Sequence, residues 1–177
     1  MLPLYQLLFF TAITARVTTV ESVQPEGPLK LHYDVPDTVK VWQSFPYGVA
    51  ISDSNHDRIM ECAEANRTAI DPSAATTSYD FRLPQSGDVL PFNMKAGEAP
   101  GSSTYTVDGD PRIGKAQFYY TDYNYCLVHV VDYKGGRCLL WLSKEAMADV
   151  PQECIDHFED TCGVQVPDNK ENLCPTI

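Results

Sequence analysis

The residues whose type and spacing point to chemistry are six cysteines, and all but the first of them follow residue 125. An even number of thiols behind an apolar N-terminal run is typical of disulfide bonds in a secreted protein, because disulfides persist in oxidising compartments. The sequence therefore predicts three disulfides. The cysteines are Cys62, Cys126, Cys138, Cys154, Cys162 and Cys174.

No other residue pattern predicts catalysis or metal binding. A thiol hydrolase needs a free cysteine, and three disulfides use all six. The chain has no HExxH, GxSxG or phosphate-binding loop. The carboxylates of segment 53–57 could hold a cation, but a polar turn explains them better. We expect no enzyme activity, no metal and no cofactor. The histidines, which are not spaced as metal ligands, are His32, His56, His129 and His157.

Composition indicates one globular domain with an acidic surface. The 177 residues are 44% hydrophobic and 21% charged, which allows a sizeable core. The net charge of -11 makes nucleic acid and anionic membranes poor partners, because both need a basic surface. The negative charge would attract a cationic ligand, although an acidic surface also keeps a protein soluble without any ligand.

The apolar run at residues 4–15 is too short to span a bilayer. We interpret residues 1–22 as a signal peptide and residues 23–177 as the mature domain; the alternative is a buried N-terminal strand. No second apolar run approaches membrane-spanning length, so we expect a secreted, extracellular monomer without a membrane anchor. The sequon that begins at Asn66 predicts glycosylation of an outward-facing asparagine.

Short strand-like segments separated by turn residues fill the middle of the chain. No helix is expected between them, which favours an antiparallel meander, and eight strands can close into a small barrel. A short helical turn is expected near residues 38–45. The eight segments are 47–52, 59–70, 76–83, 89–95, 103–108, 115–123, 125–133 and 137–143.

One longer helix is predicted after the last strand. Asp149 can cap its N-terminus with Gln152 completing a capping box, and Gly163 supplies a C-terminal stop. Its apolar face has to pack on another element. The residues of that face are Cys154, Ile155, Phe158 and Cys162.

The last two strands are apolar on both faces, which an antiparallel sheet open to water on one side would not be. One face therefore looks into the barrel and the other lies under the helix. Cys126–Cys154 and Cys138–Cys162 would then join barrel and helix; geometry favours this pairing among the fifteen that six cysteines allow. The inner set is Leu127, His129, Val131, Leu139 and Trp141, and the outer set is Cys126, Val128, Val130, Cys138, Leu140 and Leu142.

The remaining pair is Cys62 with Cys174. If Asn66 faces outward to carry a glycan, alternation turns Cys62 outward as well and points Glu61 inward. Cys62 can then reach the C-terminal tail outside the barrel.

The cysteine-bearing strands and helix resemble the salivary lipocalins of ticks, the histamine-binding-protein-like family. The similarity extends over residues 37–177 and is strongest in TDYNYC-LVHVV, C-LLW and VPQEC…F…CG, from Thr121 to Gly163. The resemblance implies an all-β fold: a secreted eight-stranded antiparallel barrel with one C-terminal α-helix outside, stapled by disulfides. Its members sequester small host molecules or interfere with host immune proteins, and a japanin-like branch binds sterol and alters dendritic cells.

Amine-binding members of that family carry Asp and Glu where this chain has Leu127 and Leu139. Those carboxylates hold a protonated amine, and a buried ammonium without a countercharge is penalised by several kcal/mol, roughly. The substitution predicts a lumen for an apolar ligand. Each aromatic residue could instead pack in the barrel core without contacting a ligand, and His129 could be an ordinary hydrogen-bonded interior histidine. The candidate ligand-binding residues are Trp42, Val49, Tyr105, Phe118, Tyr120, Leu127, His129, Leu139 and Trp141.

Three functions remain open on the sequence. The first, which we favour, is a carrier that binds a sterol, fatty acid or eicosanoid in its barrel and modulates host immunity or inflammation. The second is a histamine or serotonin scavenger that uses another inward acid such as Glu61. The third is an inhibitor of a host immune protein or cell through the outer surface.

Overall fold

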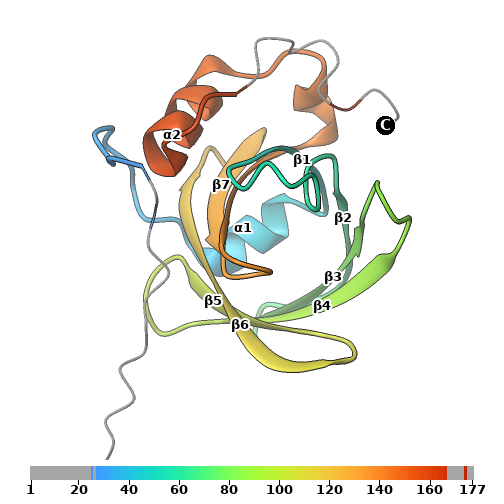
Figure 1. Ribbon diagram of the computed structural model, residues 1–177. Helices are drawn as coiled ribbons and strands as arrows, with labels where there is room; N and C mark the ends of the chain where they lie inside the picture. Colours follow the sequence, from blue (N-terminus) through green and yellow to red (C-terminus); the bar gives the residue numbers. More distant parts are fainter. Residues whose placement is uncertain (1–24, 26, 167–173, 175–177) are drawn as a thin grey trace, which may run out of the picture.

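The computed structural model describes residues 25, 27–166 and 174 as a closed antiparallel barrel of eight strands with a helix on its outer wall (Figure 1). This confirms the predicted fold class and disulfide-stapled C-terminal helix. The predicted signal peptide, residues 1–22, lies outside the described residues. The strands are β1 Tyr47–Asp53, β2 Glu64–Asp71, β3 Thr76–Arg82, β4 Val89–Ala96, β5 Ser102–Val107, β6 Asp110–Thr121, β7 Cys126–Val131 and β8 Arg137–Leu142.

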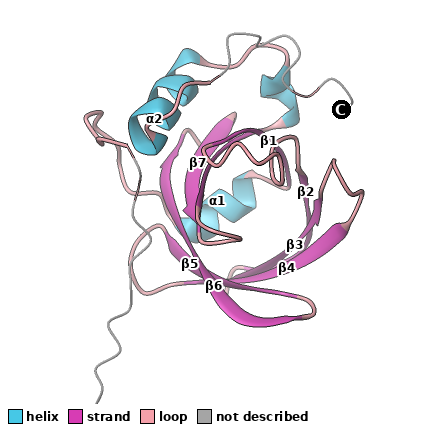
Figure 2. Ribbon diagram, viewed as in Figure 1, coloured by secondary structure: helices cyan, strands magenta, loops and turns pink. Residues whose placement is uncertain are grey.

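Each strand pairs with the next in sequence, and β8 pairs with β1, so the sheet leaves no open edge (Figure 2). Two strands begin five residues from their predicted starts, and every other strand end lies within two residues of its prediction. β2 begins at Glu64 rather than at 59, because Cys62 has a φ of 62° and the chain turns there. β6 begins at Asp110 rather than at 115, because Gly109, at a φ of 83°, allows a tight hairpin after β5.

Strands β7 and β8 contribute to two apolar cores, as predicted. Leu127 and Trp141 belong to the core inside the barrel, whereas Val128 and Leu140 belong to the core between the barrel wall and the outer helix. Every residue of both strands is buried. The two strands are therefore covered by apolar groups on both sides, and their orientation is fixed by alternation.

The outer helix, α2, covers Gln152–Cys162 and ends where Gly163 adopts a left-handed φ of 72°. The predicted capping box at its start is wrong. Pro151 is the N-cap residue, and no side chain caps the helix. The reason is local: a cap at Asp149 would place Val150 in the helix, and the residue before a proline disfavours helical backbone.

The three disulfides join the predicted pairs. Cys126–Cys154 links β7 to α2, and Cys138–Cys162 links β8 to α2. The third bond, Cys62–Cys174, spans 112 residues of sequence with a Cα–Cα distance of 5.4 Å. Two covalent links therefore hold α2 against the outer face of the same two strands.

The short helix α1, Thr38–Ser44, lies at one end of the barrel, where β1 begins (Figure 1). It agrees with the helical turn predicted near residues 38–45. Asp37 caps it by accepting the N–H of Lys40 at 2.9 Å. Trp42 and Phe45 enter the barrel core, and the Tyr79 hydroxyl donates to the Phe45 carbonyl at 2.7 Å. Helix α1 is therefore held to the barrel wall by this hydrogen bond and by side-chain packing, and it covers one end of the barrel.

A buried ion cluster lies where β1 ends and β8 begins. The Arg137 side chain is fully buried and donates from Nη1 to Asp53 at 2.5 Å. Nη1 and Nη2 also bind both oxygens of Asp57, at 2.7 and 2.6 Å. The interpretation of segment 53–57 as a polar turn is incomplete, because Asp53 is buried and serves as a counter-ion. Met60, in the loop that follows, is also buried in the barrel core.

Across the described part of the chain, no helix combines the length and apolar composition needed to cross a membrane.

The disulfides predict a graded loss of stability. Replacing Cys62 and Cys174 by alanine should lower the free energy of unfolding by about 5 kcal/mol, because their bond closes the longest loop. The matched change at Cys138 and Cys162, which are 24 residues apart, should cost about 3.5 kcal/mol. Urea unfolding measures both values. A larger loss from the shorter loop would contradict the loop-closure explanation.

The ion cluster predicts a pH dependence in acid. Hydrogen bonds from Arg137 lower the pKa of Asp57 from 3.8 to about 2. Because the folded-state pKa is depressed, the stabilisation is complete above pH 3.8 and is lost as the pH falls towards 2. The stability difference between wild type and Asp57→Asn should therefore shrink over that window in urea titrations. A difference that stays constant down to pH 2 would refute the pairing.

Candidate functional site

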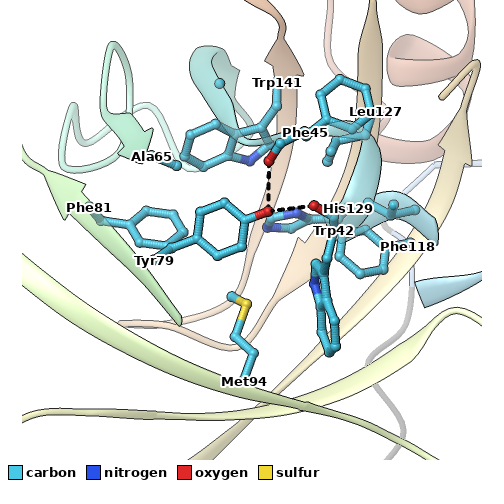
Figure 3. Close-up of a pocket in the computed structure, with 12 residues that line it drawn as sticks. Trp42, Phe45, Ala65, Tyr79, Phe81, Met94, Phe118, Leu127, His129 and Trp141 are labelled. Carbon is cyan, nitrogen blue, oxygen red and sulfur yellow. Dashed lines mark hydrogen bonds between the residues drawn. The ribbon is translucent and has the colours of Figure 1, made fainter. Parts of the chain in front are cut away.

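A small apolar cavity lies inside the barrel next to α1 (Figure 3). Its volume is about 50 Å³, room for roughly four water molecules. Twelve residues line it, and none carries a carboxylate, an ammonium or a guanidinium group. They are Val41, Trp42, Phe45, Gly48, Ala65, Tyr79, Phe81, Met94, Phe118, Leu127, His129 and Trp141.

Strand alternation and one helix turn explain the position of these side chains. In β7, Leu127 and His129 are two residues apart and so share the inner face, where Trp141 of β8 lies opposite Leu127 in register. Trp42 of α1 and Phe45, the residue that follows the helix as its C-cap, both enter the barrel core. The lining side chains therefore come from the strands, from α1 and from its C-cap residue, without a long loop.

Five predicted ligand-binding residues line the cavity: Trp42, Phe118, Leu127, His129 and Trp141. Leu139 and Tyr105 lie in the barrel core but do not line it. Leu139 pairs with His129 across the strands and is fully buried. Tyr105 donates its hydroxyl proton to Asp132 at 2.8 Å, nearer the end of the barrel that holds the ion cluster.

The predicted inward orientation is wrong for Val49 and Tyr120. Val49 faces the outer core under α2, and Tyr120 stacks on His157 of α2 with ring centroids 3.7 Å apart. β1 is buried on both faces, so its sequence has no alternation to reveal which residues face inward. In β6 a register shift between Phe118 and Tyr120 changes the alternation partway along the strand.

Several lining residues were not predicted from the sequence, among them Tyr79 and Phe81 of β3. Their signal was present in the sequence, because polar and aromatic residues alternate from Ser78 to Arg82. Phe81 packs edge-on against Trp141 with centroids 5.4 Å apart. The residues of α1 carry no comparable signal, since a helix of seven residues is too short to show a period.

His129 is the one lining residue whose ordinary pKa is close to neutral. Burial lowers its pKa from 6.5 to about 4, so the imidazole is uncharged at physiological pH. Its ring lies 5.5 Å from that of Phe118 and 6.0 Å from that of Trp141, centroid to centroid. The cavity therefore presents no net charge to a ligand.

Other chemical candidates have structural explanations. Among the described residues, one group of potential metal ligands comes together, namely Asp122, Cys126 and Cys154. The two cysteines form a disulfide, and Asp122 accepts three backbone N–H groups in a turn. Asn66 is exposed on β2, the orientation that a glycan needs, and its glycosylation stays a prediction. Glu61 lies in the turn before β2 and does not line the cavity.

Comparison with known proteins gives one family match. A family model described as tick histamine binding protein matches residues 88–172, which include strands β4 to β8 and helix α2. No curated protein sequence matches the chain significantly.

Burial of His129 can be measured by titration. Because the uncharged imidazole is favoured inside the barrel, the ¹H resonances of the His129 ring carbons should shift with pH, with a midpoint near pH 4. A midpoint for His129 near 6.5 would show that its ring is in water and does not line a closed cavity.

Proposed function

Because this chain belongs to the tick salivary lipocalins, we propose that it is a secreted protein that binds a small apolar ligand inside its barrel. Removal of that ligand from the host would modulate immunity or inflammation. A sterol, a fatty acid and an eicosanoid are the classes that such a lumen suits. The observation that carries the proposal is the uncharged lining of the cavity.

The lining supports an apolar ligand over a biogenic amine. Histamine and serotonin carry a protonated amine near neutral pH, and an ammonium inside this cavity would have no carboxylate beside it. The uncompensated charge would cost several kcal/mol, roughly. Leu127 lines the cavity at the position where amine binders have an aspartate, so the sequence difference falls on the cavity wall itself.

The volume of the cavity limits the ligand. A space of about 50 Å³ holds a few non-hydrogen atoms, so a sterol or an eicosanoid requires the wall to move. α1 is the element best placed to move, because it is one short helix held to the barrel by hydrogen bonds and by the packing of Trp42 and Phe45. We propose that any ligand of more than a few non-hydrogen atoms, the aromatic probes below included, enters as α1 moves outward as a unit, which keeps the Trp42 ring on the wall of the enlarged space. A sterol ligand would place the chain in the japanin-like branch.

Secretion is part of the same proposal. Three disulfides are stable only in an oxidising compartment. Cleavage of the signal peptide at residues 1–22 and glycosylation of Asn66 are further proposed steps of that route.

Both tryptophans of the chain line the cavity, so tryptophan fluorescence, excited where the ten tyrosines do not absorb, reports on this site alone. Toluene should change the emission saturably, and histamine should not. Leu127→Asp should weaken toluene binding by at least about tenfold, because a carboxylate would have to be buried or solvated inside the lumen. Tyr125→Phe, a change at an exposed aromatic outside the cavity, is the matched control.

Saturable histamine binding to the wild-type protein would contradict the proposal and favour an amine scavenger that uses a different acid. Absence of binding by either compound would favour action on a host protein through the outer surface.

A further inference from the structure

Three of the residues that line the cavity each carry a buried polar side-chain atom that no described protein group satisfies. Five buried side-chain polar atoms in the described residues lack a hydrogen-bond partner, and three of them belong to cavity-lining residues. These are Nε1 of Trp42, Nε1 of Trp141 and Nδ1 of His129. Their side chains are 2%, 3% and 7% exposed. Buried polar atoms are normally paired, so three unpaired ones around one space call for an explanation.

The three rings surround one region of the cavity. Figure 3 shows Trp42, His129 and Trp141 grouped about the hydroxyl end of Tyr79. That hydroxyl donates to the Phe45 carbonyl, so its proton is already used within the protein. Neither indole N–H group donates to the Tyr79 oxygen or to any other acceptor in the described part of the chain, and the walls around them are apolar.

The chemistry of these atoms selects a hydrogen-bond acceptor. An indole N–H can only donate, and an uncharged imidazole donates from one nitrogen and accepts at the other. A ligand oxygen that accepts from an indole would remove the desolvation penalty of a buried donor. A hydrocarbon would leave all three atoms unsatisfied, and an ammonium, which only donates, would leave both indoles unsatisfied.

The absence of charged side chains in the lining narrows the class of ligand further. A carboxylate would accept from both indoles, but no lysine or arginine among the lining residues could neutralise it. Burying an unpaired carboxylate carries the same type of penalty as burying an unpaired ammonium. An uncharged oxygen avoids both penalties.

We propose that the cavity recognises an uncharged apolar molecule through one accepting oxygen, an alcohol, ketone, ester or ether, to which Trp42 and Trp141 donate and beside which His129 lies. The inference rests on the proposed function and refines it: it favours neutral oxygenated ligands over fatty-acid carboxylates and over amines as the group held in the cavity.

The test uses four singly substituted benzenes of similar size. Acetophenone carries a neutral acceptor, α-methylstyrene has a carbon in its place, benzoate is the anion and benzamidinium is the cation. The two indole N–H resonances of the protein, one from each tryptophan, are followed in ¹H–¹⁵N correlation spectra during titration. Trp42→Phe and Trp141→Phe each remove one donor and keep an aromatic ring. Tyr125→Phe is the control outside the cavity.

Acetophenone should move at least one indole N–H resonance downfield, and α-methylstyrene should not. Each tryptophan variant should weaken the binding of acetophenone by about fivefold to tenfold, which is the effect of one hydrogen bond. The affinity for α-methylstyrene should change by less than about twofold. Retained binding of the hydrocarbon also shows that the variant is folded. Benzoate and benzamidinium should bind at least about tenfold more weakly than acetophenone.

The inference fails, with the proposed function intact, if both neutral compounds bind but the tryptophan variants weaken the binding of both equally. It also fails if acetophenone and α-methylstyrene give the same indole N–H chemical shifts. It also fails if either ion binds as tightly as the ketone. If none of the four compounds binds, the proposed function itself fails.

Discussion

Strands β7 and β8 are buried on both faces, and the rest of the protein is arranged to keep them so. Their inner residues need a closed barrel, and their outer residues need a cover. α2 provides that cover, and disulfides from each strand fix it in place. The covalent links cost the folded state little freedom, because Cys126, Cys138, Cys154 and Cys162 are already buried where strand and helix pack.

The same constraint produces the site. Cys126 and Cys138 must face α2, so Leu127 and the side chains two residues further along β7 must face the lumen. The wall that carries the disulfides outside therefore carries His129 and Trp141 inside. α1 fills the lumen from the end where β1 begins, and what remains is a small apolar space with three nitrogen atoms unpaired. Stability of the wall and chemistry of the cavity are set by alternate residues of the same strands.

Much of this arrangement could be predicted from the sequence because alternation is strong wherever both faces of a strand are apolar and cysteines mark one of them. The prediction failed where alternation is interrupted or absent. A bulge in β6 turns Tyr120 outward, and β1 is so uniformly buried that Val49 gave no sign of its face. The start of α2 was misplaced because the effect of Pro151 on the preceding residue outweighed a favourable capping pattern. The buried partnership of Asp53 with Arg137 depends on contacts 84 residues apart, which no local pattern contains.

The central claim is that the lumen, and not the outer surface, holds the ligand by an accepting oxygen among uncharged walls. A crystal structure of the protein with acetophenone bound tests it most directly. The claim predicts the compound inside the barrel, with its oxygen about 2.7–3.2 Å from the indole nitrogen of Trp42 or Trp141. Acetophenone bound only on the outer surface, or bound in the lumen with its oxygen turned away from both indoles, would contradict it.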